Sequence, residues 1–152
     1  MRNGLWFAKW EAFNVQHAGI NYLAVLVAAA AAWLAGAIYY GVLSQRWIAA
    51  LGKTKETLMP GGRPTTPTFI LSFVCEFVMA FVLAGAIGHL GPGQVTFKNG
   101  VISALILWGG FILTTFAASY AYAHNKPKLL AIDAGHWLIV MVLMGAIIGA
   151  WG

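Results

Sequence analysis

Charged side chains are scarce in this 152-residue chain: they make up 9% of it, and hydrophobic residues make up 61%. An ordinary soluble domain devotes about a quarter of its residues to Asp, Glu, Lys and Arg. A soluble domain of this length would have too little charge to cover its surface. The composition therefore excludes that class and indicates an integral membrane protein.

The chain also lacks the residues for most metal and disulfide chemistry. Cys75 is the single cysteine, so no intrachain disulfide can form. A bis-histidine haem would need two histidines at one depth, but His124 lies in a predicted turn and His136 well inside a predicted helix. Zinc would need more nitrogen or sulfur ligands than any predicted face offers. We expect no metal site and no cofactor.

Signals for catalysis and for nucleic-acid binding are equally weak. Glycines lie within spans or turns and form no phosphate-binding loop. Ser72 lies one helical turn from Glu76, but no histidine is placed to activate it. The net charge of +5 comes from Lys and Arg near the ends of apolar segments, which is typical of membrane flanks. The sequence assigns no catalytic residue, argues against an enzyme and predicts no nucleic-acid partner.

Four apolar segments are present, each long enough to cross a bilayer, since ~20 helical residues at ~1.5 Å each span the ~30 Å hydrocarbon core. They are residues 22–43, 68–90, 101–122 and 129–151. The links before the third and fourth segments are short, so neighbouring spans are antiparallel. The predicted fold is an all-α integral membrane protein, with residues 21–152 forming an antiparallel four-helix transmembrane bundle.

Residues 1–20 are polar but unusually aromatic, and Trp6, Trp10 and Phe13 follow helical spacing. This pattern predicts an amphipathic segment lying at the membrane surface. Two alternatives stay open: an unstructured tail with aromatic anchors, and an arm that docks on another membrane protein.

The longest predicted loop, residues 44–66, begins with a second interfacial pattern. Trp47 lies on the apolar side of a short helical turn that Gly52 would end. Thr66 followed by Pro67 is typical of a helix start. Small-residue pairs within the spans allow helix backbones to approach closely. The pairs are Ala84 with Gly88, and Gly145 with Gly149.

Lysine and arginine predict the orientation, because they concentrate in cytoplasmic loops. The first and third loops hold Arg46, Lys53, Lys55, Arg63, Lys126 and Lys128, whereas the termini and second loop hold Arg2, Lys9 and Lys98. Both termini are therefore expected on the side away from the cytoplasm.

The polar residues inside the spans gather at one depth. Counting ~1.5 Å per residue from the predicted cytoplasmic edge, Glu76, Thr115 and His136 lie roughly 10–12 Å deep and Asp133 ~6 Å deep. Ser119 and Tyr40 belong to the same half of the membrane. Ionisable groups inside a membrane are costly and commonly functional. We predict a cluster that binds a proton, a cation or a small polar ligand.

A structural interpretation of the same residues stays open. Glu76 could hydrogen-bond to Ser119 or Thr115 and join two helices, and Asp133 could pair with Lys128 at the interface. On its own, a histidine such as His136 is more often a hydrogen-bonded packing residue than a ligand-binding one.

The chain resembles a bacterial family of small four-span inner-membrane proteins known only as a domain of unknown function. The resemblance rests on NYLAVLVAAAAAWLAGAIYY in the first span, on residues 47–52, and above all on IDAGHW at residues 132–137. It covers roughly residues 21–151 and implies a four-span fold in the bacterial inner membrane. It implies no activity and no catalytic residue.

Two functions follow as hypotheses. The first is binding or movement of a proton, cation or small polar ligand through the polar cluster. The alternative is a non-catalytic accessory subunit, which packs against a larger membrane complex through the aromatic N-terminal arm. The bilayer is the expected environment in both cases, and a homo-oligomer is a further expected assembly.

Overall fold

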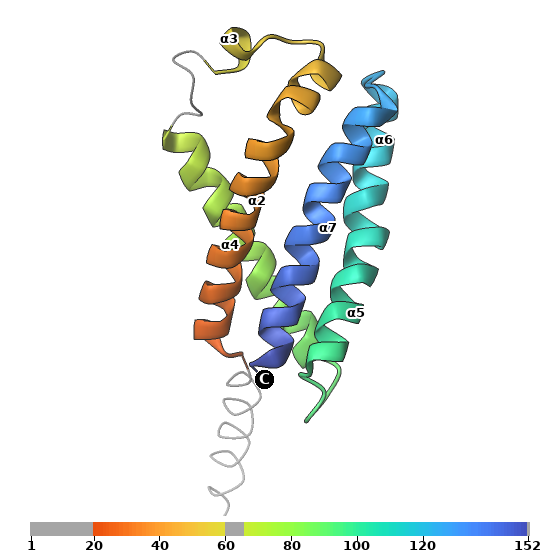
Figure 1. Ribbon diagram of the computed structural model, residues 1–152. Coiled ribbons are helices and arrows are strands. Elements are labelled where there is room, and N and C mark those ends of the chain that lie inside the picture. The colour runs from red at the N-terminus through yellow and green to blue at the C-terminus, as the bar shows by residue number, and fades with distance from the viewer. Residues whose placement is uncertain (1–19, 60–65, 152) are drawn as a thin grey trace, which may run out of the picture.

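Four long helices form the fold, as the computed structural model describes it for residues 20–59 and 66–151 (Figure 1). Each of the four is long and apolar enough to cross a membrane. The helices are α2 (Tyr22–Leu51), α4 (Thr66–Gly88), the third span formed by α5 (Phe97–Leu107), η1 (Trp108–Leu113) and α6 (Thr114–Tyr122), and α7 (Pro127–Ala150). A short helix, α3 (Lys55–Leu58), lies between α2 and α4. The predicted four-helix membrane bundle is confirmed.

Helix α7 is the centre of the bundle. In Figure 1 it stands between α2 on one side and α5–α6 on the other, and α4 crosses behind α2. Half of its most apolar stretch, 50%, is buried inside the protein, compared with 6% for the third span. Few residues of the third span are therefore fully buried, whereas α7 is buried among the other helices.

The first helix is longer than the sequence predicted. Residues 44–51 were expected to begin a loop, but they continue α2 without a break to Leu51. Gly52 ends the helix with a left-handed φ of 68°, as predicted, and its amide donates to Ala49 and Ile48 carbonyls. At ~1.5 Å per residue the helix is roughly 45 Å long, so its last turns extend beyond the hydrocarbon core.

The other boundaries differ from the prediction by a few residues. The third span begins four residues early, at Phe97, because Thr96 caps it by accepting a hydrogen bond from the Asn99 amide. Pro127 occupies the first turn of α7, where a missing amide costs nothing. The third span is also not α-helical throughout, since Trp108–Leu113 form a π-helical segment.

Glycine allows the closest helix contact, between α5 and α7. A Cβ at Gly100 would lie 2.9 Å from the Gly145 carbonyl carbon and 3.2 Å from the Cα of Gly149. The predicted packing role of Gly145 and Gly149 is thereby confirmed. Ala84 is buried, but Gly88 is exposed with open space around its Cα, so this second pair forms no close contact within the described chain.

Replacing Gly100 by alanine should separate α5 from α7. The new methyl group would meet the Gly145 backbone, which cannot rotate away, and overpacking of this kind costs about 1–3 kcal/mol. The free energy of unfolding, measured in mixed micelles by tryptophan fluorescence during an SDS titration, should fall by that amount. Gly85→Ala is the matched control, because nothing lies within 4 Å of its Cβ position. Equal stability of the two variants would contradict the close contact.

Candidate functional site

Asp133, in α7, is buried among three hydrogen-bond donors. The Tyr40 hydroxyl donates to Oδ1 over 2.7 Å, the Trp47 indole donates to Oδ1 over 2.9 Å, and the Tyr120 hydroxyl donates to Oδ2 over 2.6 Å. The carboxyl group is 7% exposed. An ionised carboxylate can only accept hydrogen bonds, and this set of donors suits it. We call these four residues the Asp133 cluster; it joins α2 and α6 to α7.

Backbone carbonyls on either side of Asp133 accept further side-chain hydrogen bonds. The Tyr39 hydroxyl donates to the Ile132 carbonyl, and the Trp108 indole donates to the Ala134 carbonyl, both over 2.9 Å. Gly135 leaves room for the first of these, because a Cβ there would lie 3.0 Å from the Tyr39 hydroxyl. The IDAGHW motif is therefore where α7 receives polar side chains from both neighbouring spans.

His136 lies against the backbone of α2. A Cβ at Gly36 would lie 2.7 Å from its Nε2, so glycine is needed for the imidazole to fit. The ring packs on Tyr40, with centroids 4.7 Å apart, and on Trp137, with centroids 5.0 Å apart. The side chain is 6% exposed, and its Nδ1 is buried with no hydrogen-bond partner among the described residues.

Glu76, on α4, also has a buried polar atom without a hydrogen-bond partner in the described part of the chain. It is 4% exposed, and its Oε2 is buried without a hydrogen-bond partner within the described ranges. Unpartnered buried polar atoms are uncommon in proteins, and each costs about 1–3 kcal/mol. Hydrogen bonds among the described residues therefore do not account for the burial of Glu76 Oε2 or of His136 Nδ1.

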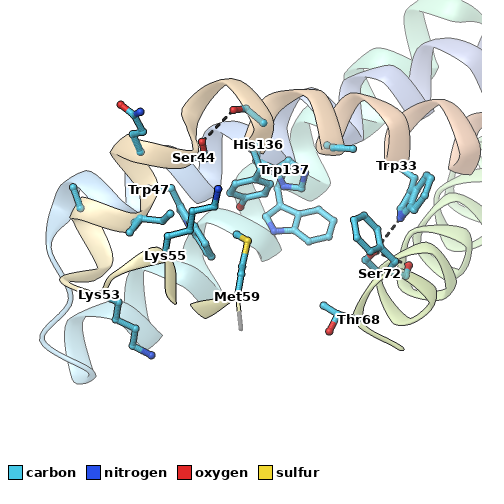
Figure 2. Close-up of a pocket in the computed structure, with 18 of the residues that line it drawn as sticks. Trp33, Ser44, Trp47, Lys53, Lys55, Met59, Thr68, Ser72, His136 and Trp137 are labelled. Atoms are coloured by element: carbon cyan, nitrogen blue, oxygen red, sulfur yellow. Dashed lines mark hydrogen bonds between the residues drawn. The ribbon is translucent and has the colours of Figure 1, made fainter. Parts of the chain in front are cut away.

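A cavity of ≈ 980 Å³ between α2, α4 and α7 brings these two residues together. Its walls are mainly apolar and include five aromatic residues, and Trp33 and Ser72 lie at one end while Lys53 and Lys55 lie at the other (Figure 2). Its lining includes Trp33, Tyr40, Trp47, Phe69, Glu76, His136 and Trp137. We call this space the α2–α4 cavity. Its volume is at the upper end of the range, about 300–1,000 Å³, of pockets that hold small molecules.

The predicted polar cluster divides into two groups. Asp133 and Tyr40 bond to each other, whereas Glu76 and His136 line the α2–α4 cavity, which Tyr40 also borders. Thr115 and Ser119 are exposed on α6, away from the cavity lining. Neither of them makes the hydrogen bond to Glu76 that the structural interpretation allowed. That interpretation also paired Asp133 with Lys128, but Asp133 accepts hydrogen bonds from tyrosine and tryptophan side chains. Trp6, Trp10 and Phe13 lie outside the described residues.

Sequence reasoning missed most of the donors to α7. Trp47 was assigned to the membrane interface, yet its indole reaches inward to Asp133, because α2 continues past Ser44. Tyr120 and Trp108 were given no role. A signal was available for Tyr120: like Asp133, it lies close to the turn between the last two spans.

The donor set does not suit a metal ion. Within residues 20–59 and 66–151, no group of three or more His, Cys, Asp and Glu side chains is close enough to hold one. The free cysteine, Cys75, is exposed on α4.

Removing one donor from Asp133 should destabilise the protein. Tyr120→Phe deletes a 2.6 Å hydrogen bond to the carboxylate, and bonds to charged groups contribute about 1.5–3 kcal/mol. The free energy of unfolding in mixed micelles should fall by that amount. Tyr122→Phe is the matched control: Tyr122 is 90% exposed, so its loss should change stability by less than about 0.5 kcal/mol. The hydrogen-bonding role of Tyr120 is contradicted if both variants are as stable as the parent.

The comparisons with known proteins give a family and no activity. Neither the search of curated proteins nor the search of solved structures found a match. Residues 23–149 match the family model described as "Protein of unknown function (DUF1761)". This range contains all four spans apart from their outermost residues. The chain is therefore a multi-pass membrane protein that belongs to the DUF1761 family.

Proposed function

We propose that this protein binds a small polar molecule in the α2–α4 cavity, through Glu76 and His136. One observation carries the proposal: Glu76 and His136 come from different helices and line one cavity, and each has a buried polar atom without a hydrogen-bond partner among the described residues, Oε2 and Nδ1. A ligand that hydrogen-bonds to both would remove the cost of leaving them unpaired.

The size of the cavity favours a molecule over a proton. A proton relay needs a chain of titrating groups or waters, whereas a mainly apolar cavity of ≈ 980 Å³ suits an organic ligand. The proposal puts the lysine end of the cavity at the cytoplasmic face. This follows from the positive-inside rule, because Lys53 and Lys55 lie in the loop after α2 and Lys126 and Lys128 lie beside the turn before α7.

The proposal predicts opposite effects of removing the two buried acids. Glu76→Met replaces an unpartnered carboxyl by an apolar side chain of similar length, so the ligand-free protein should gain about 1–3 kcal/mol of stability. Asp133→Leu leaves three donors without an acceptor and should lose at least about 2 kcal/mol. Stability gained by removing a polar group is the pattern expected of a binding site.

The measurement is an SDS titration of protein that native mass spectrometry shows to carry no small molecule. A loss of stability in Glu76→Met as large as that in Asp133→Leu would make Glu76 a structural residue, and the proposed function would be wrong. Glu56→Gln is the control for removing a glutamate as such. Glu56 is fully exposed, and hydrogen bonds from its own backbone amide and from Thr54 lower the pKa of its carboxyl group.

A further inference from the structure

We propose that the ligand of the α2–α4 cavity is an organic cation that carries N–H donors on an apolar body, such as a primary amine or a guanidine. This inference rests on the proposed function and names the chemical class that the site would accept. It follows from the hydrogen-bonding capacity that remains free on the cavity walls and from the aromatic surface around it.

Five side chains that border the cavity already donate hydrogen bonds within the protein. Their bonds run from Trp33 to Ser72, from Ser72 to the Phe69 carbonyl, from Ser44 to the Gly41 carbonyl, and from Tyr40 and Trp47 to Asp133. Glu76 Oε2 is an unused acceptor, and His136 Nδ1 accepts or donates according to its tautomer. The Trp137 indole also borders the cavity and has no hydrogen-bond partner among the described residues. A group rich in N–H donors would find its acceptor in the Glu76 carboxyl group.

The position of Glu76 along α4 also favours a cationic ligand. Glu76 lies ten residues into α4, roughly 15 Å from the start of that helix, and its Oε2 has no partner of any kind among the described residues. A carboxylate at this depth is stabilised by a positive charge close to it. A bare metal ion does not fit, since within the described part of the chain Glu76 belongs to no metal-binding group.

Aromatic rings supply the rest of the environment. Trp33 stands edge-on to Phe69, with ring centroids 5.7 Å apart, and Tyr40, Trp137 and Trp33 all border the cavity. The faces of such rings attract cations and pack against apolar groups at the same time. A cation with an apolar body would use both the carboxylate and these walls.

Lys53 and Lys55 lie at the end of the cavity away from Trp33 and Ser72 (Figure 2). Lys55 is the first residue of α3. Both are exposed, so their charges are screened by water and salt, but they still oppose the entry of a cation. Their effect therefore has the opposite sign from that of Glu76. Substituting a lysine should therefore change cation binding in the opposite direction from substituting Glu76, which provides a second, independent test.

The experiment compares three probes with the same body and different head groups: 4-phenylbutylamine, 4-phenylbutanol and 4-phenylbutyrate. Binding is measured by calorimetry on the full chain in nanodiscs of phosphatidylcholine, with empty nanodiscs as the blank. We expect the amine to bind at least ten-fold more tightly than the other two probes. Glu76→Gln should weaken the amine at least ten-fold and change the alcohol less than three-fold, whereas Lys55→Met should tighten the amine two- to five-fold.

Two controls make the outcome specific. Glu56→Gln should change amine binding less than two-fold, because this fully exposed glutamate does not line the cavity and its charge is screened by water. The N,N,N-trimethyl derivative of the amine keeps the charge but has no N–H donor, so it should bind more weakly than the parent amine.

The outcomes separate the two proposals. If the alcohol or the carboxylate binds as tightly as the amine, and Glu76→Gln weakens it equally, the cavity is a ligand site but the cationic class is wrong. If all three probes bind no better than to empty nanodiscs, or bind independently of Glu76, both proposals are overturned.

Discussion

The structure depends on the burial of a carboxylate. Asp133 lies inside a membrane bundle, where an unpaired charge is prohibitively costly, so it is stable only if donors surround it. Tyr40, Trp47 and Tyr120 supply those donors from both neighbouring spans. Because one acceptor serves two other helices, it fixes their register along α7. Trp47 reaches Asp133 because α2 continues past Ser44.

The second buried acid, Glu76, is the counterpart of the first. Both residues are more than nine-tenths buried, but Asp133 has three donors and Glu76 Oε2 has none among the described residues. A bundle that can surround one carboxylate so fully is able, in principle, to surround another. The two acids therefore differ in their surroundings: Asp133 joins three helices by hydrogen bonds, whereas Glu76 lines the α2–α4 cavity.

The sequence predicted most of the fold and only part of the site. Apolar length alone locates four spans, and Gly52 and Pro127 mark their ends by local backbone chemistry. The acids and His136 were found because ionisable residues inside spans are rare. Their partners could not be found in this way, since Trp47 is 86 positions from Asp133 and reaches it only through tertiary packing. Thr115 was predicted at about the depth of Glu76 and Ser119 in the same half of the membrane, but both are exposed, because depth along a helix says nothing about which neighbour a side chain meets.

The two sides of α7 differ in how far their neighbours can move. On the α5 side, Gly100 and Gly145 bring two backbones into contact, so any displacement costs packing along the whole interface. On the α2 side, Gly36 leaves room for the imidazole of His136, and hydrogen bonds to Asp133 hold the C-terminal half of α2 against α7. Among the residues that the structure describes, no side-chain hydrogen bond joins α4 to α7, and one, from Trp33 to Ser72, joins α4 to α2. Helix α4 is thus the wall of the cavity that is held least, and a ligand bound at Glu76 would act first on its position.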